Sequence, residues 1–144
     1  MKRAANKRYL TQWGAQYYVA AELSRRGYLV SFTLGNAETT DLIVISPNQK
    51  HFRVEVKGQK THNFWRFRNP KTPNDNLYYI LVYLSLKKPL ENPRFFILTC
   101  SEIMNERKKY QESVTPRGNY DDSQGGMNWG TSIQYENKWE KLPN

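Results

Sequence analysis

The sequence predicts an α/β (α+β) domain in which a central mixed β-sheet is flanked by helices. Three observations lead to this fold class. A stretch with helical spacing of its apolar residues comes first, five apolar runs of strand length follow, and a second helical run comes after the last strand. The 144 residues fit one domain around a hydrophobic core, which we assign to residues 1–144.

The first element is expected to be a helix from Thr11 to Arg26. Thr11 can cap its start, and Gly27 follows its end, where glycine readily adopts the left-handed conformation that stops a helix. Its apolar residues recur near helical spacing: Trp13, Tyr17, Ala20, Ala21 and Leu23.

Three strands are expected next, at Tyr28–Leu34, Asp41–Ser46 and His51–Lys57, separated by runs of turn residues. The short turn of residues 47–50 makes the second and third strands a hairpin. The third strand alternates, so its side chains divide between two faces. One face carries Phe52, Val54 and Val56, and the other carries Arg53, Glu55 and Lys57.

A basic connection with interleaved aromatic residues runs from Gly58 to Asn76, and loops of this length in compact domains are often functional. Two further strands are expected at Tyr78–Leu84 and Arg94–Thr99. A helix should follow at Ser101–Glu112, with Ser101 as its cap.

The rest of the chain carries weaker signals. Residues 114–131 are rich in Gly, Asn and Asp and are expected to form loops. The last segment is expected to be a short strand or helix that packs Ile133, Tyr135 and Trp139 on the body. Cys100 follows an apolar run, which favours a small core residue over a nucleophile.

The chain carries 22 Lys and Arg against 13 Asp and Glu, a formal net charge of +9. Nucleic acid is the first candidate partner, because phosphates attract a basic surface through counterion release. The same charge also fits an anionic membrane surface or simple solubility. A single cysteine excludes an intramolecular disulfide, and His51 and His62 lack the spacing of zinc ligands. Without an apolar leader or a spanning run, we expect a cytoplasmic protein with no membrane partner.

The residues that point to chemistry are Asp41 at the start of one strand and Glu55 and Lys57 at the end of the next. Neighbouring antiparallel strands bring these ends together, so the two carboxylates should lie side by side. Two carboxylates in such a position repel each other, and a hard cation relieves the repulsion by binding both.

This arrangement suits phosphodiester hydrolysis. We expect Mg²⁺, with Mn²⁺ as a substitute, on Asp41, Glu55 and the backbone carbonyl of Val56, where it would lower the pKa of a bound water. Lys57 would orient that water and stabilise the charge developing on phosphorus. Gln59 lies on the same face if the strand continues, and it could hold the water or a phosphate oxygen.

The short pattern has a plain alternative, because Glu-x-Lys occurs three times in the chain. The copy at Glu106 falls on an expected helix, and the copy at Glu136 has no acidic strand before it. Only the copy at Glu55 combines apolar alternation with an upstream Asp at a strand start. The competing interpretation of that copy is an exposed hairpin face with ordinary charged residues.

The order helix, strand, strand with Asp and strand with Glu-x-Lys resembles the PD-(D/E)XK (restriction-endonuclease-like) nuclease superfamily. The stretch GAQYYVAAELSRRGYLVSFTLGNAETTDLIVISPNQKHFRVEVKGQ is similar to uncharacterised bacterial members and, more distantly, to Holliday-junction resolvases. The resemblance spans roughly residues 12–100, with YENKW near the end also in keeping. It implies a restriction-endonuclease-like core and a divalent-metal site at Asp41, Glu55 and Lys57.

Two departures from the family pattern matter. Thr40-Asp41 stands where the family has Pro-Asp, which is a mild change. Gln16 stands where many relatives carry a helical Glu that assists the metal, and a neutral amide is a poorer ligand. Glu22 lies on another face of the same helix and is expected at the surface, with replacement of the missing acid as the less favoured alternative. The glutamine in place of the helical acid motivates the alternative of a catalytically weakened or inactive nuclease-fold protein that binds nucleic acid.

The basic loop after Lys57 supplies the candidate nucleic-acid contacts Lys60, Trp65, Arg66 and Arg68. The arginines would contact phosphates at the rim of the cleft, and Trp65 would either stack on a base or anchor the loop to the core. A second basic group, Lys2, Arg3, Lys7 and Arg8, is more typical of a frayed, solvated chain end than of a DNA-binding arm.

The sequence therefore favours a Mg²⁺-dependent endodeoxyribonuclease, with RNA as an alternative substrate. A homodimer would let two sites cut both strands, although no sequence feature demonstrates one. The competing classes are a silent nucleic-acid-binding module and a protein-interaction domain whose basic charge is incidental.

Overall fold

A computed structural model describes residues 2–118 and 120–144, with side chains from residue 8 onward. The side chains of Lys2, Arg3 and Lys7, part of the N-terminal basic group, lie outside the described residues. The elements follow the order α1 (Lys2–Arg25), β1 (Leu29–Phe32), β2 (Leu42–Ile45), β3 (His51–Gln59), β4 (Trp65–Arg66), β5 (Leu77–Tyr83), β6 (Arg94–Thr99), α2 (Cys100–Val114), β7 (Gly126–Met127) and α3 (Trp129–Ser132), with short 3₁₀ turns among and after the last ones.

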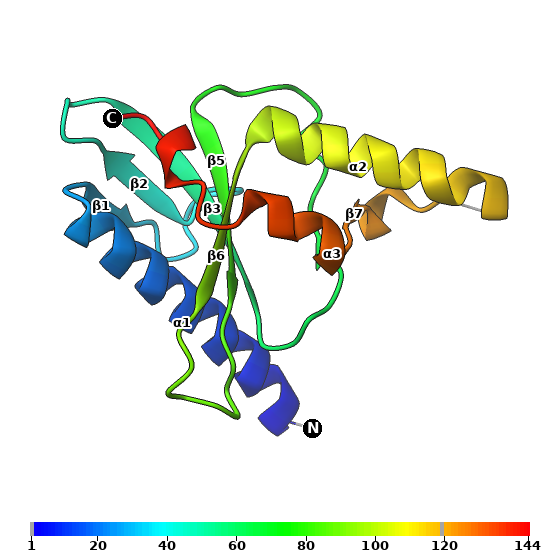
Figure 1. Cartoon of the computed structure of the whole chain (residues 1–144), viewed down its shortest axis with the longest axis horizontal. Coiled ribbons are helices and arrows are strands. Elements are labelled where there is room, and N and C mark those ends of the chain that lie inside the picture. Colours follow the sequence, from blue (N-terminus) through cyan, green and yellow to red (C-terminus); the bar gives the residue numbers. More distant parts are fainter. Residues whose placement is uncertain (1, 119) are drawn as a thin grey trace.

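The expected central mixed sheet is confirmed, with five strands in the order β1-β2-β3-β5-β6 (Figure 1). Strands β1, β2 and β3 form an antiparallel meander, and β6 is antiparallel to β5. Strand β5 is parallel to β3, so the long connection between them must cross back to the starting end of the sheet. That connection includes β4, which pairs with β7 in a separate two-stranded sheet.

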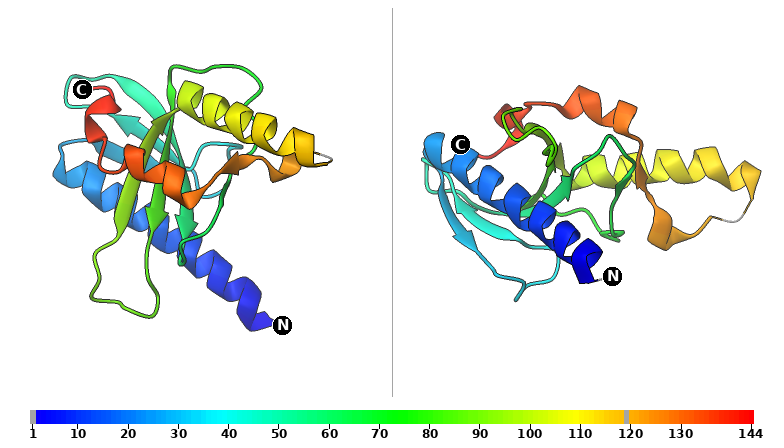
Figure 2. Two further views of the ribbon diagram at one scale, coloured as in Figure 1. Left: turned by 45° about the vertical axis from the view of Figure 1, so that its right-hand side comes forward. Right: turned by 90° about the horizontal axis from the view of Figure 1, so that it is seen from below.

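Both faces of the sheet are covered at β5 and β6, and two hydrophobic clusters result, whereas Leu29 of β1 and Ile43 of β2 stay exposed. Helix α1 covers one face with Ala15, Val19 and Leu23, each fully buried. Helix α2, α3 and the connection around β4 cover the other face (Figure 2). Residues along β5 alternate between the two clusters, as the two-residue period of a strand requires. Burying each large aliphatic side chain stabilises the fold by about 1.5–3 kcal/mol.

Several boundaries differ from the sequence-based expectation. Helix α1 begins at Lys2 rather than Thr11, because the preceding Lys, Arg and Ala residues are good helix formers. Its end before Gly27 is confirmed, and that glycine has a φ of 91°. Strand β3 continues to Gln59, two residues beyond the expected end.

The cap of α2 was assigned wrongly to Ser101. Thr99 is the N-cap: its hydroxyl accepts from the Glu102 N–H at 3.1 Å, and the Glu102 carboxylate accepts from the Thr99 N–H at 2.8 Å. Only Thr99 has a Glu three residues later, and this reciprocal pair satisfies two otherwise free N–H groups.

In the last segment, Tyr135 and Trp139 pack on the body as expected, whereas Ile133 is 42% exposed and the packing expected of it was wrong. Ile133 starts a 3₁₀ turn that directs its side chain outward while Tyr135 faces inward. Cys100 is buried as expected. Among the described residues, no helix has both the length and the apolar character needed to cross a bilayer.

Gly58 allows α1 to approach β3 closely, and this predicts a specific sensitivity. A Cβ at Gly58 would lie 2.8 Å from the Ala15 Cβ and 2.9 Å from the Thr11 carbonyl oxygen. Gly58→Ala should therefore lower the free energy of unfolding by about 1–3 kcal/mol through overpacking. Urea denaturation measures this loss as a lower midpoint.

Gly130→Ala is the matched control, because a Cβ at that position meets no atom within 4 Å. It should be neutral or slightly stabilising, since Ala is the better helix former. Equal effects of the two substitutions would contradict the close approach of α1 to β3.

Candidate active site

The candidate site forms where β3 continues past the start of its antiparallel neighbour β2. Backbone groups on this edge of β3 have no strand partner among the described residues, and two side chains supply their hydrogen bonds instead. The Asp41 Oδ2 accepts from the Val56 N–H at 2.7 Å. Gln12, on α1, donates its amide to the Val56 carbonyl at 2.8 Å and accepts from the Gly58 N–H at 3.1 Å. Asp41 and α1 are thereby tied to the same stretch of β3.

The residues around this edge line a polar cleft of about 250 Å³. It contains Asp41, Glu55 and Lys57, so the expected convergence of these three side chains is confirmed. Asp41 immediately precedes β2. Because Leu42 pairs with Val54 in the antiparallel ladder, the next position places Asp41 across from Glu55. The other lining residues are Gln12, Glu38, Thr39, Thr40, Val56 and Arg68.

Glu55 is 5% exposed and has an uneven environment. Its Oε1 lies 2.6 Å from the Lys57 Nζ. Its Oε2 is buried and makes no well-formed hydrogen bond among the described residues, although the Tyr79 side chain is close enough to interact with the carboxylate. The buried Tyr79 stands directly opposite in β5, and burial together with the charge of Glu55 raises the pKa of Tyr79. A buried carboxylate oxygen that lacks a well-formed hydrogen bond is costly, which makes Oε2 a candidate ligand atom.

Both oxygens of Asp41 have partners. Besides the Val56 N–H on Oδ2, the Gln16 amide donates to Oδ1 at 3.3 Å. Burial raises the pKa of Asp41, and the Val56 N–H opposes this shift. The charge of Glu55 raises this pKa further and that of Lys57 lowers it. The fold therefore keeps the carboxylates of Asp41 and Glu55 close together although their negative charges repel each other.

The oxygen donors fit a hard divalent cation in part. Asp41, Glu55 and the Val56 carbonyl offer the oxygens that Mg²⁺ and Mn²⁺ prefer, and Mg²⁺ usually keeps several waters. No group of three His, Cys, Asp or Glu side chains suited to a metal occurs within the described part of the chain. Amides of Gln12 and Gln16 already bond to the Val56 carbonyl and to Asp41 Oδ1. A cation here would rest on two carboxylates, and it would share Asp41 Oδ1 and the Val56 carbonyl with these amides.

Two predicted site residues have other tasks in the structure. Gln59 donates to the Phe64 carbonyl at 2.9 Å and accepts from the Asn63 N–H at 3.2 Å, so it braces the loop instead of holding a water. Trp65 is 1% exposed and packs near Phe96 and Trp129, so base stacking by Trp65 was wrong. The alternative that Trp65 anchors the loop is confirmed, because alternation within β4 turns its ring inward.

The basic candidates separate in space. Arg68 reaches the rim of the cleft, where it lies 3.5 Å from Glu38. Arg66 is exposed but is not among the residues that line the cleft. Hydrogen bonds from Ser123 and, to a smaller extent, the charge of Arg66 lower the pKa of Asp121. The Arg66 side chain is therefore in the neighbourhood of Asp121. Lys60 lines a neighbouring pocket. Of the two arginines expected at the rim, Arg68 is confirmed and Arg66 is not.

Sequence reasoning missed Gln12 and Glu38, and it considered Gln16 only as a missing acid. Gln12 and Gln16 are four residues apart and therefore share a helix face, which is a signal that could have identified them. Glu22, expected at the surface, pairs with Arg25 and Arg26 and does not line the cleft.

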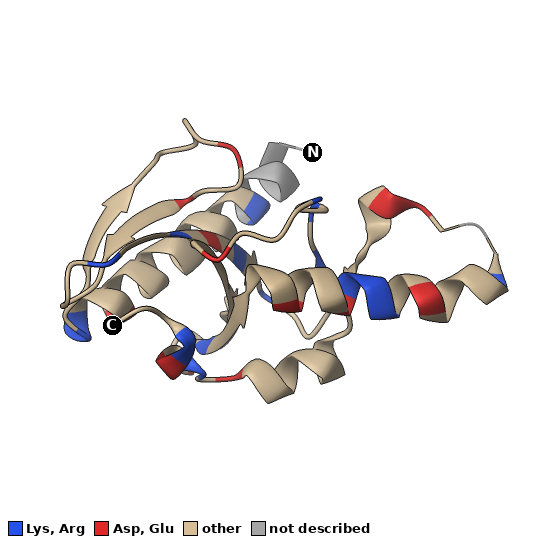
Figure 3. Ribbon diagram, turned by 90° about the horizontal axis from the view of Figure 1, so that it is seen from above, with Lys and Arg blue, Asp and Glu red and all other residues tan. Residues whose placement is uncertain are grey.

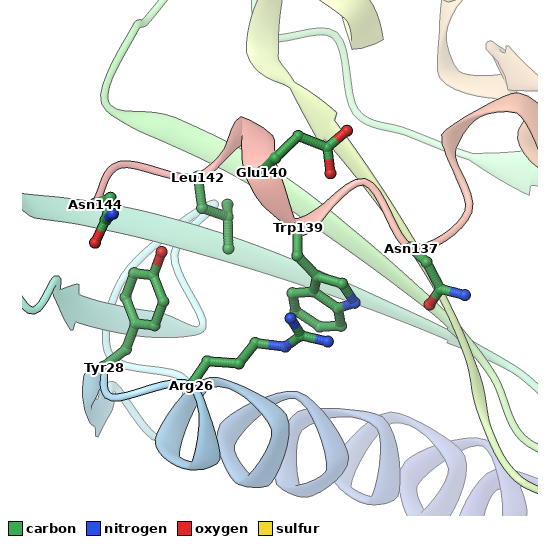
Figure 4. A pocket seen from close by; sticks show the side chains of 7 residues that line it. All are labelled: Arg26, Tyr28, Asn137, Trp139, Glu140, Leu142 and Asn144. Carbon is green, nitrogen blue, oxygen red and sulfur yellow. The ribbon is translucent and has the colours of Figure 1, made fainter.

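Other features of the surface lie apart from the cleft. Figure 4 shows a pocket in which the Arg26 side chain lies over the Trp139 ring. The pocket has a volume of about 660 Å³, the Arg26 guanidinium carbon lies 4.4 Å from the ring centroid, and none of the lining residues is shared with the cleft. Acidic and basic residues mix along α2, which carries three of each (Figure 3). The excess of positive charge therefore does not come from α2.

Comparisons with protein-family models, with curated proteins and with solved structures gave no match.

The raised pKa of Asp41 predicts a pH-dependent cost to stability. Its folded pKa lies above the ordinary 3.8, so the free energy of unfolding should fall as pH rises from there through the folded pKa. Asp41→Asn removes this titration while an amide oxygen can still accept from Val56. In metal-free buffer, the stability of the variant relative to the original chain should increase across this acidic window and then level off.

Urea denaturation at a series of pH values measures this difference. A difference that stays constant with pH, or that decreases as pH rises, would contradict the account of Asp41.

Proposed function

We propose that the protein is a divalent-metal-dependent nuclease with a restriction-endonuclease-like fold, which hydrolyses phosphodiester bonds in DNA, with RNA as the alternative substrate. One observation carries the proposal: Asp41, Glu55 and Lys57 converge in one polar cleft at the end of β3. An exposed hairpin face with unrelated charges would not bury Glu55.

The chain topology supports the same proposal. A helix is followed by three antiparallel strands, and the next strand of the central sheet is parallel to the third. This order, with the acidic residues where the second and third strands meet, resembles the PD-(D/E)XK core. A loop containing β4 makes the crossover from β3 to β5.

Each side chain of the cleft has a distinct part in this chemistry. Asp41, Glu55 and the Val56 carbonyl would hold Mg²⁺, which when bound supplies a Lewis acid for the phosphate and an acidified water. Lys57 sets a positive charge beside Glu55, where it stabilises negative charge that develops on the phosphate. Arg68 at the rim would bind a phosphate oxygen after releasing the exposed Glu38. This last exchange costs little, because exposed ion pairs are weak.

The proposal predicts Mg²⁺- or Mn²⁺-dependent cleavage of plasmid or four-way-junction DNA, with RNA of equal length assayed in parallel. Asp41→Asn, Glu55→Gln and Lys57→Ala should each lower the rate by about 10²-fold or more, as loss of a preorganised charge does. Gel assays of purified variants measure the rate. Glu112→Gln, at an exposed position of α2, is the control and should keep full activity. Full activity of Glu55→Gln would refute the proposal.

A second candidate, a nuclease-fold protein that binds nucleic acid without cutting it, is favoured by the two glutamines. Their amides occupy Asp41 Oδ1 and the Val56 carbonyl, which a cation would need. Metal binding distinguishes the candidates. If the protein is the enzyme, millimolar Mn²⁺ should raise its thermal midpoint. At a free Mn²⁺ concentration of 100 times Kd, the free energy of unfolding should rise by about 2.7 kcal/mol.

Asp41→Asn should lose this stabilisation, and Gln16→Glu, which adds a carboxylate beside Asp41, should strengthen it. Differential scanning fluorimetry measures all three proteins. If Mn²⁺ stabilises only Gln16→Glu, the silent module is the better description.

A further inference from the structure

We propose that the pocket beside the cleft, lined by Arg8 and Lys60, binds a backbone phosphate of a nucleic-acid strand. The next phosphate of the same strand would lie in the cleft. This pocket has a volume of about 340 Å³, at the lower end of the range for ligand sites. The inference rests on the proposed function in one respect, since it takes the ligand to be the strand that the cleft holds.

The two pockets adjoin, because Gln12 lines both of them. Its amide bonds to the Val56 carbonyl on the side of the cleft and to the Gly58 N–H on the side of the second pocket. Val56 and Gly58 are two residues apart on β3, which is a rise of about 6.6 Å. Phosphates along one nucleic-acid strand follow one another at a comparable spacing, so a strand can occupy both pockets.

The charge of the second pocket is unbalanced. Arg8 comes from α1 and Lys60 from the loop after β3, and no acidic residue lines the pocket. Both side chains are exposed, and neither has an acidic partner in the described part of the chain. In the cleft, by contrast, Lys57 pairs with Glu55 and Arg68 with Glu38. The pocket that adjoins the cleft therefore carries positive charge from Arg8 and Lys60 that no acid in its lining balances, and it suits an anion.

Backbone and side-chain contacts hold the walls of the pocket in place. Gln59 clamps the loop through Phe64 and Asn63, and Gly58 lets α1 approach β3 closely. The Phe64 ring lines the pocket and contacts Tyr110 with ring centroids 4.8 Å apart. It offers an apolar wall for the sugar or base attached to the phosphate. The backbone of the walls is therefore already ordered, so binding has to order only the Arg8 and Lys60 side chains.

This arrangement gives Arg8 a role that its place near the start of the chain did not suggest. A frayed basic end would contact phosphates without a fixed geometry. Here, Arg8 is within helix α1 and lies across the pocket from a lysine far along the chain. The helix and the loop together form the site.

The test measures the binding of a fluorescently labelled oligonucleotide, with EDTA present so that no cleavage occurs, over a series of salt concentrations. Arg8→Ala combined with Lys60→Ala should weaken binding and lower the slope of log affinity against log salt by up to ~2, as expected for two lost phosphate contacts. The control, Lys50→Ala with Lys138→Ala, removes the same charge at two exposed positions that line neither pocket, and should change the slope much less.

Equal slope changes in the two double variants would overturn the proposal, because general charge would then explain the effect. So would an unchanged slope in the Arg8 and Lys60 variant. Inorganic phosphate serves as the second probe. If millimolar phosphate raises the thermal midpoint of the original chain but not of this variant, and oligonucleotide affinity is equal in both, the pocket is a free-anion site and the assignment to a strand is wrong.

These outcomes are separable from the test of the proposed function. If the Arg8 and Lys60 variant has a smaller salt slope but the original chain never cleaves DNA, the pocket assignment is supported and the nuclease proposal is refuted. Metal-dependent cleavage with an unchanged slope would support the nuclease and refute the pocket.

Discussion

The overhang of β3 beyond β2 is the constraint on which the rest of the site depends. A strand edge inside a domain cannot leave its N–H and carbonyl groups unpaired, because each would cost about 1–3 kcal/mol. The protein meets this demand with side chains: Asp41 takes the Val56 N–H, and Gln12 takes the Val56 carbonyl and the Gly58 N–H. The same contacts attach α1 to the sheet and direct Asp41 toward Glu55.

The carboxylates consequently serve the fold and the site at once. Asp41 replaces a missing strand partner, and this holds it in a half-buried position where its negative charge is unfavourable. Glu55 is buried more deeply, where Lys57 lies 2.6 Å from one of its oxygens and the buried Tyr79 stands opposite in β5. A cation bound to both carboxylates would offset this cost. Gln16 offsets a smaller part of it with an amide, which is why the same geometry suits either an enzyme or a silent descendant.

Gln12 joins two pockets of opposite electrostatic character. The cleft holds acids that are partly balanced by Lys57 and Arg68, whereas the neighbouring pocket holds Arg8 and Lys60 without an acid. Under the proposed function, a polyanion that enters the cleft would have to overcome repulsion from Glu38, Asp41 and Glu55. Basic residues on the adjacent wall would then supply the compensating attraction.

Periodic patterns in the sequence were enough to predict the main elements of the sheet and the convergence of Asp41, Glu55 and Lys57. Alternation along β3 assigns Glu55 and Lys57 to one face, and a short turn makes β2 the neighbour of β3. Both properties are local. The sequence did not predict the cap at Thr99, the clamp made by Gln59 or the position of Arg8, and it left the burial of Trp65 undecided. These depend on contacts between segments far apart in the chain. Only tertiary packing decides whether an aromatic or charged side chain in a loop faces the core, the cleft or the solvent, because a loop has no repeating geometry.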